Sequence, residues 1–152
     1  MSDLIEHFRA ATRGLRVSHV WRGYGSAFFL ELGNLTDSTA RRRDGSQGSP
    51  SGEIGVMIEW SWRIEQGNSI LCGSCSEESL WQPAFDLLVG QEVLGLSTFG
   101  RLPELALSLS SELHVLSFMT AEGDPDWTLF DRRNAEKPVT VHCQAGAIIR
   151  ER

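Results

Sequence analysis

The sequence has few cysteines and no long apolar run, and each shortage excludes a class of protein. Three cysteines are too few, and odd in number, for a disulfide framework, so we expect free thiols in a reducing compartment. No run approaches the roughly 20 apolar residues that span a bilayer. Asp3 and Glu6 stand where a secretory signal would be basic and then apolar. These shortages predict a cytoplasmic protein that does not enter a membrane.

Short catalytic motifs are missing as well. The chain contains no H-E-x-x-H, G-x-S-x-G, P-loop or G-x-G-x-x-G pattern. His7, His19 and His114 are scattered along it. A hydrolase assembled from residues distant in sequence stays open, but the sequence favours a non-catalytic protein without a cofactor.

Basic residues are fewer than acidic ones, 14 against 20, which gives a formal net charge of -6. Such a balance disfavours broad adhesion to nucleic acid or to an anionic membrane. Lys137 is the only lysine, so the other basic residues are arginines; this reflects genome composition as readily as recognition of carboxylates. The charge therefore predicts a basic protein partner, with neither nucleic acid nor membrane bound.

Two segments have the apolar spacing of amphipathic helices. In residues 2–15 and again in residues 80–88, apolar side chains recur every three or four positions. Ser74 or Ser76, followed by acidic residues, is suited to cap the second helix. We therefore expect one N-terminal and one central helix.

Most of the remaining chain alternates apolar and polar residues, as half-buried strands do. The clearest case is IGVMIEWSWRIE, residues 54–65, which we predict to be one strand. Residues 17–33 read as a hairpin, and residues 92–119 as three consecutive antiparallel strands. The expected fold is α+β, in one domain spanning residues 1–152: a curved antiparallel β-sheet or partly closed barrel of about eight short strands.

Residues 33–53 differ in composition from the rest of the chain. They are rich in Gly, Ser and Asp and nearly devoid of large apolar residues, which predicts a flexible loop. The loop carries the run Arg41, Arg42 and Arg43. These arginines are either a solvated tip or a basic finger that contacts an acidic partner or a phosphate.

Cys72 and Cys75 form a C-x-x-C pair just before the central helix. A redox dithiol occupies such a position because a helix N-terminus lowers the thiol pKa, but that motif belongs in a βαβ unit, which the pattern lacks. A metal site would need His142 or Cys143 as further ligands, and these neighbours point to opposite faces of a strand. We favour small buried side chains over both alternatives.

Acidic residues gather near tryptophans in two places. Glu59, Arg63 and Glu65 lie on the polar face of the strand at residues 54–65. In a second group, Asp124, Asp126 and Asp131 lie around Trp127. Acidic groups beside an exposed tryptophan suit a basic protein partner. We therefore predict contact residues among Glu59, Arg63, Glu65, Asp124, Asp126 and Trp127.

The tryptophans also support an alternative function. A curved sheet with a long loop beside it can enclose a cavity for a small molecule or a reaction. Trp60, Trp62 and Trp81 would line such a pocket.

A series of short elements in residues 53–130 resembles a class of small uncharacterised bacterial proteins. The elements are WSWRIE, SILCGS, LLVGQEVLGL, PELALSLSSELHVLSF and DWTL, with Glu104 where that class more often has aspartate. Some members are immunity or toxin-neutralising proteins. The resemblance implies a compact, acidic, non-catalytic inhibitor that covers the basic face of a toxin, and it assigns no residue by position.

Overall fold

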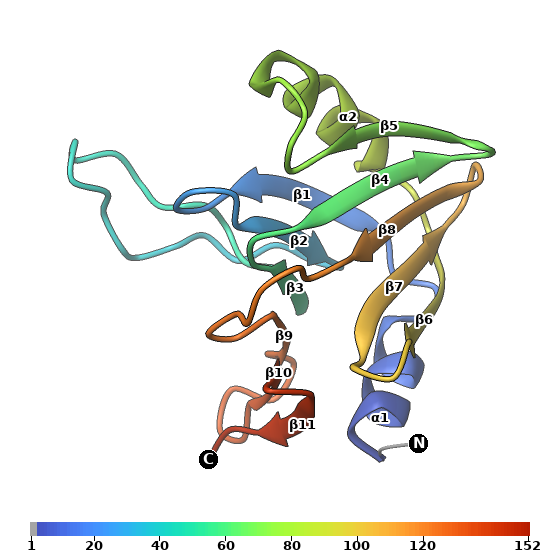
Figure 1. The fold of residues 1–152 in the computed structure, drawn as a ribbon. Coiled ribbons are helices and arrows are strands. Elements are labelled where there is room, and N and C mark those ends of the chain that lie inside the picture. Colours follow the sequence, from blue (N-terminus) through green and yellow to red (C-terminus); the bar gives the residue numbers. More distant parts are fainter. Residues whose placement is uncertain (1–2) are drawn as a thin grey trace.

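The structure is a computed structural model that describes residues 3–152. It is α+β, with two antiparallel sheets and two α-helices (Figure 1). The single curved sheet that the sequence predicts is therefore replaced by two sheets, which are not closed into a barrel. The start of the predicted first helix, Ser2, lies outside the described residues.

Eleven strands are present in the described part of the chain, more than predicted. The six-stranded sheet has the order β1 (Val17–Arg22), β2 (Phe28–Leu32), β3 (Ile54–Ile58), β9 (Trp127–Asp131), β10 (Val139–Gln144) and β11 (Ala147–Arg150). The five-stranded sheet has the order β5 (Ser69–Gly73), β4 (Trp62–Gln66), β8 (Leu113–Ser117), β7 (Glu104–Leu109) and β6 (Val93–Phe99). The predicted hairpin in residues 17–33 and the three consecutive strands in residues 92–119 are confirmed.

The prediction of one strand over residues 54–65 is wrong. The segment forms β3 and β4, which belong to different sheets, because the chain turns a corner at residues 59–61. Trp60 has a φ of 29°, an uncommon conformation for a bulky residue. The alternation of apolar residues continues through the corner, so periodicity alone does not reveal the change of sheet.

Both helices turn an apolar face inward. Helix α1 (Asp3–Thr12) contacts β6 and β9 and buries Ile5 and Phe8 completely. Helix α2 (Trp81–Leu88) follows a short 3₁₀ turn (Glu78–Leu80) and packs against β1 and β5. Neither predicted serine caps α2, since the Ser76 hydroxyl instead accepts the Gly73 amide at 2.9 Å. No helix in residues 3–152 is long and apolar enough to cross a membrane.

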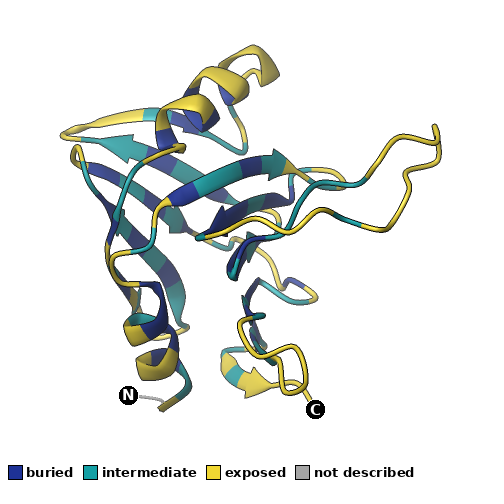
Figure 2. Cartoon of the chain, turned by 180° about the vertical axis from the view of Figure 1, so that it is seen from behind, coloured by how far each residue is buried: buried dark blue, intermediate teal, exposed yellow. Residues whose placement is uncertain are grey.

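The two sheets and both helices share one apolar core, seen as dark stripes on the inner faces of the strands (Figure 2). Trp62 is at its centre: its ring is stacked on that of Phe28 at 4.7 Å between centroids and meets the edge of Trp81 at 5.0 Å. The start of β1 also bonds to the segment before β6, with the Val17 amide donating to the Gln91 carbonyl at 2.9 Å. These contacts hold the two sheets together.

Residues 33–53 form a hairpin-like arm, called the arm below, that projects from between β2 and β3 (Figure 1). Thr36 and Ser51 bond to each other through both backbone amides, at 2.7 and 2.9 Å, and Arg42 donates to the Ser46 carbonyl nearer the tip. Most of the arm is exposed (Figure 2). The arm is thus a bonded extension of the β2–β3 connection.

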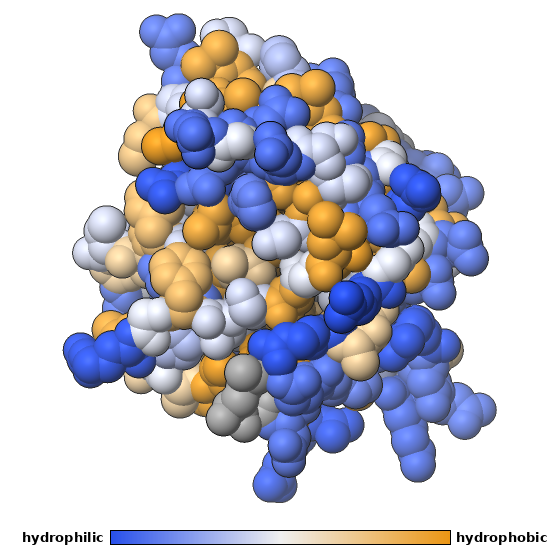
Figure 3. Space-filling model, turned by 90° about the vertical axis from the view of Figure 1, so that its right-hand side faces the viewer, coloured by the Kyte–Doolittle hydropathy of each residue, from blue (hydrophilic) through white to orange (hydrophobic). Residues whose placement is uncertain are grey.

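The side of the molecule that carries β6 has a mixed surface. Apolar side chains form a central strip with hydrophilic residues around it (Figure 3). Strand β6 and its surroundings contribute exposed Leu94 and Phe99.

Candidate functional site

The β1–β2 turn meets the β3–β4 corner in a hollow of about 230 Å³, called the aromatic hollow below. It is lined by Tyr24, Gly25, Ser26, Glu59 and Trp60. The Ser26 hydroxyl donates to the Trp60 carbonyl at 2.8 Å, which fixes the turn against the corner. Tyr24 is 98% exposed and Trp60 is 54% exposed, so two large aromatic rings stand in solvent at one place.

Glu59 is the charged member of this hollow. Burial raises the pKa of its carboxyl above the ordinary value. Within residues 3–152 no hydrogen-bond donor or cation reaches that carboxylate. A half-buried carboxylate without a partner is costly, and its position beside two aromatic faces is suited to a cation from another molecule.

The other predicted contact residues already have partners. Arg63 donates to the Glu65 carboxylate at 2.7 Å, so this pair is neutralised on the outer face of the five-stranded sheet. Asp124 accepts the Gln144 side-chain amide at 2.8 Å, and Asp126 accepts the Gly123 backbone amide at 2.7 Å. The Glu59 amide donates to the Asp126 carbonyl, which brings the two acidic segments together through the backbone.

Trp127 is not on the surface, which contradicts the prediction that it contacts a partner. It is fully buried at the start of β9, between Ile58 of β3 and Cys143 of β10. Its indole N–H donates to the Pro103 carbonyl at 3.1 Å. Strand pairing on both sides turns this side chain into the core, so the exposed tryptophan beside an acidic group is Trp60.

The predicted tryptophan-lined pocket is also absent from the described residues. Trp62 and Trp81 are 0% and 5% exposed and pack against each other and Phe85. Trp60 faces outward on the other side of the corner. The rings of Trp62 and Trp81 therefore fill the space that the predicted pocket would have occupied.

The cysteines do not converge on one point. Cys72 lies in β5 and Cys143 in β10, which belong to different sheets, and Cys75 is exposed. Among residues 3–152 no group of three or more histidine, cysteine or acidic side chains is placed to hold a metal ion, so His142 and the cysteines form no such site. Burial raises the pKa of the Cys72 thiol, and burial with smaller effects of Asp126 and Glu104 raises the pKa of Cys143 to about 11.

Thiol labelling should separate these cysteines. We expect a water-soluble aromatic disulfide reagent to modify one thiol per native chain, Cys75, because the other two are at most 1% exposed. In denaturant all three thiols should react. A Cys75→Ser variant is the control and should show no rapid reaction when folded; rapid labelling of two or more native thiols would contradict the burial.

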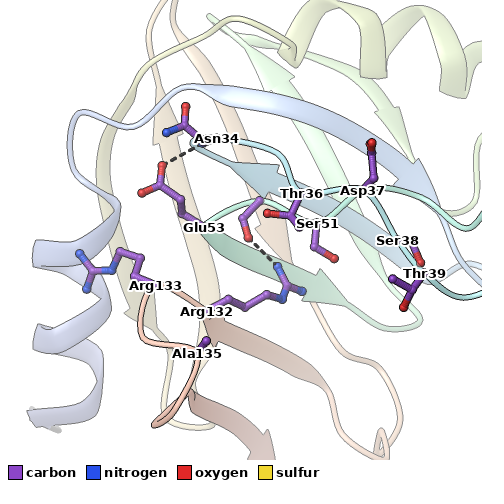
Figure 4. Close-up of a pocket in the computed structure, with 11 residues that line it drawn as sticks. Asn34, Thr36, Asp37, Ser38, Thr39, Ser51, Glu53, Arg132, Arg133 and Ala135 are labelled. Atoms are coloured by element: carbon purple, nitrogen blue, oxygen red, sulfur yellow. Dashed lines mark hydrogen bonds between the residues drawn. The ribbon is translucent and has the colours of Figure 1, made fainter.

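A second, larger cavity of about 630 Å³ lies between the arm and the β9–β10 connection (Figure 4), and is called the arm cavity below. Its lining is mostly polar: Asn34, Thr36, Asp37, Ser38, Thr39, Ser51, Gly52, Glu53, Arg132, Arg133 and Ala135. Arg132 and Arg133 are adjacent in sequence, yet their side chains diverge, Arg132 toward the arm and Arg133 toward α1 (Figure 4).

The base of the arm is held by a buried carboxylate, Glu31, whose residue is 1% exposed. It accepts hydrogen bonds from the Trp21 indole at 2.9 Å, the Gly52 amide at 3.1 Å and Arg132 Nη1 at 2.9 Å. Buried charges are stable only when they are paired and bonded in this way. Glu31 thus ties β1, the arm and the end of β9 to one another.

Arg133 is engaged elsewhere. It donates to Asp131 through its backbone and its guanidinium, and His7 of α1 bonds to the same carboxylate at 2.8 Å. The hydrogen bonds from the Arg133 side chain, ahead of the other contacts, lower the pKa of Asp131 to about 2. Asp131 therefore joins α1, through His7, to the end of β9, and it occupies Arg133. Arg132 is the guanidinium available to the arm cavity.

One of the three arginines of the arm, Arg42, makes hydrogen bonds within the arm itself. Arg42 donates to the Ser49 hydroxyl at 3.1 Å, across the arm. Arg41 and Arg43 are exposed near the tip. The hypothesis that they form a basic finger stays a prediction.

Several residues at these two hollows were not singled out from the sequence. Tyr24, between two glycines, is a bulky aromatic at a hairpin tip, and Glu31 is a lone carboxylate in the apolar run FFLEL. Each residue is unusual for its local sequence pattern, and this could have marked it as a candidate functional residue. Arg132 has no such signal, because its role depends on the distant Glu31.

No family model, no curated protein and no solved structure matches this chain.

Proposed function

We propose that the protein is a non-catalytic, cytoplasmic binding protein that holds a basic protein partner at the aromatic hollow. The observation that carries this proposal is the Glu59 carboxylate, half-buried and without a partner in residues 3–152, beside exposed Tyr24 and Trp60. A lysine or arginine side chain from the partner would lay its stem on the rings and its charge against Glu59.

The energetics support a protein partner. Tyrosine and tryptophan are the residue types that most often anchor interfaces, since they offer a large rigid area at low entropic cost. A cation over an aromatic face contributes roughly 0.5–2 kcal/mol, depending on its exposure. The net charge of -6 adds long-range attraction for a basic partner.

An inhibitor of the immunity type is the form of this function that we favour. Such a protein covers a basic face of a toxin and needs no catalytic group of its own. The resemblance of residues 53–130 to that class supports this form, as does the acidic balance of the chain. The corner that carries Glu59 and Trp60 lies within the resembling segment.

Partner capture with matched variants tests the proposal. The tagged chain and its Glu59→Gln, Trp60→Ala and Tyr24→Ala variants would each be used to capture proteins from a native lysate. We expect a basic protein that the wild type retains, with its Kd raised about tenfold or more by each variant.

Glu136→Gln is the matched control, because it removes an exposed carboxylate from the β9–β10 connection. It should leave the Kd within about twofold of the wild type. If every captured protein binds the three hollow variants as tightly as the wild type, the aromatic hollow is not the binding site and the proposal is wrong.

A further inference from the structure

We propose that the arm cavity is a second binding site, for a small hydroxylated molecule carrying one oxyanion group, a carboxylate or a phosphate. Arg132 would bind the oxyanion, and the arm would bind the hydroxyl groups. This site is separate from the aromatic hollow. The hollow lies where Phe28 pairs with Ile58, and the arm begins where Leu32 pairs with Ile54, so the two sites are at opposite ends of β2 and β3.

The guanidinium of Arg132 is held by only one of its nitrogens. Nη1 donates to Glu31 at 2.9 Å and to the Gly52 carbonyl at 3.1 Å. An arginine has five N–H donors in a planar fork, and within residues 3–152 no acceptor bonds to Nε or Nη2. The edge formed by Nε and Nη2 is the one that binds a carboxylate or phosphate through two parallel hydrogen bonds.

The position of this guanidinium is built into the fold. It lies over the Phe130 ring, 4.9 Å from the ring centroid, and over Gly55, where a Cβ atom would lie 2.8 Å from Nη1 and Nη2. Gly52 is equally confined, since a Cβ there would be 2.5 Å from the Leu32 carbonyl. A guanidinium fixed before the ligand arrives loses little entropy on binding.

The rest of the lining selects for hydroxyl groups. The Thr36, Thr39 and Ser51 hydroxyls make no side-chain hydrogen bonds to other described residues. Asp37 has no partner in residues 3–152 either, and Glu53 uses one oxygen to accept the backbone N–H of Asn34 at 2.8 Å. These carboxylates accept hydroxyl donors and disfavour a ligand with more than one oxyanion group.

The size and polarity of the cavity agree with this class of ligand. A volume of about 630 Å³ is within the range of roughly 300–1,000 Å³ for small-molecule sites. Apart from Gly52 and Ala135, the residues that line it have polar or charged side chains, which can bond to the hydroxyl groups of a ligand. Sugar acids and sugar phosphates have the required combination of hydroxyls and a single oxyanion group.

Titration of the full-length chain, followed by NMR, tests the proposal with three probes. Glucuronate carries a carboxylate, glucose 6-phosphate a phosphate, and glucose neither. We expect at least one charged probe to shift the Arg132 Nε–H signal and the amides of the arm in a saturable way. Glucose should bind about tenfold more weakly or worse, since it lacks the charge-assisted bonds. The two charged probes distinguish a carboxylate site from a phosphate site.

Two variants separate binding from support of the arm. Arg132→Lys keeps the charge but loses the paired N–H edge, and should raise the Kd about tenfold or more. Thr36→Val leaves the bond between Glu31 and Arg132 intact and should raise the Kd about threefold or more. Arg150→Lys, on the exposed edge strand β11, is the control and should not change the Kd.

The proposal is overturned if neither charged probe shifts these signals, if glucose binds as tightly, or if the binding persists unchanged in folded Arg132→Lys and Thr36→Val. Partner capture at the aromatic hollow should be the same for Arg132→Lys and the wild type. Failure of this site therefore leaves the proposed protein-binding function intact, and the converse also holds.

Discussion

Replacing Trp62 with alanine is expected to lower the free energy of unfolding by about 3–5 kcal/mol. The ring is fully buried where the two sheets meet α2, and it contacts Phe28 and Trp81. Its indole N–H donates to the Ser26 carbonyl at 2.7 Å. The substitution thus creates a large cavity and leaves a part-buried carbonyl without its donor. Denaturant unfolding followed by circular dichroism measures the loss.

Trp60→Ala is the matched control, since it lies two residues earlier in the same alternating run. Trp60 is 54% exposed, and we expect its removal to cost less than about 1 kcal/mol. Trp62→Ala is therefore expected to cause a large loss of stability, whereas Trp60→Ala is expected to weaken partner binding with little loss of stability. Equal losses of stability would contradict the corner at residues 59–61.

Replacing Glu31 with alanine is the second large effect, with an expected loss of about 3 kcal/mol. Three donors lose their acceptor: the Trp21 indole, the Gly52 amide and Arg132 Nη1. The side chain of Arg132 is 32% exposed and regains water in part, which keeps the loss at the lower end for a broken buried pair. Denaturant unfolding measures the total.

Hydrogen exchange locates the effect of Glu31→Ala. The Gly52 amide and the Trp21 indole N–H should lose protection, while the amides of β7 and β8 change only by the global loss of stability. Glu31→Gln keeps the size and one acceptor oxygen, and should cost less than Glu31→Ala. Glu136→Ala, which removes an exposed carboxylate, is the control. If Glu31→Ala unfolds at the same denaturant concentration as this control, the prediction is wrong.

The two proposed sites use opposite ends of the same strands. The hairpin turn and the corner form the aromatic hollow at one end of β2 and β3, and the arm forms its cavity at the other. Glu31, near the arm end of β2, is the buried group that fixes the arm cavity. A change at Glu31 is therefore expected to reach the arm cavity before the aromatic hollow.

Local patterns predicted much of the secondary structure. The hairpin of β1 and β2, the three strands β6 to β8 and the helix α2 all follow from short-range spacing and turn residues. In β7 the alternation is matched by the burial, since Leu105, Leu107 and Leu109 are buried. These features depend on neighbours a few residues away, which a single sequence displays.

The candidate sites were predictable only in their chemistry. An acidic residue beside an exposed tryptophan was expected, and Glu59 is such a residue, but its tryptophan is Trp60 and not Trp127. Period-two alternation predicted that Trp60 points inward with Ile58 and Trp62, because alternation continues unchanged through residues 59–61 and does not reveal the corner there. A residue in the corner belongs to neither strand, so the alternation of the strands does not determine the direction of its side chain.

The sequence by itself therefore determined the class of the fold, the direction of most side chains in each strand, and the excess of acidic charge. Only the tertiary structure decided which strands pair and in which sheet, since β3 pairs with β9 and β4 pairs with β8, and both partners are distant in sequence. The physical reason is that alternation is a property of one strand, whereas burial depends on what covers it. Long-range pairing covers Trp127, exposes Trp60 and places Glu31 under Arg132.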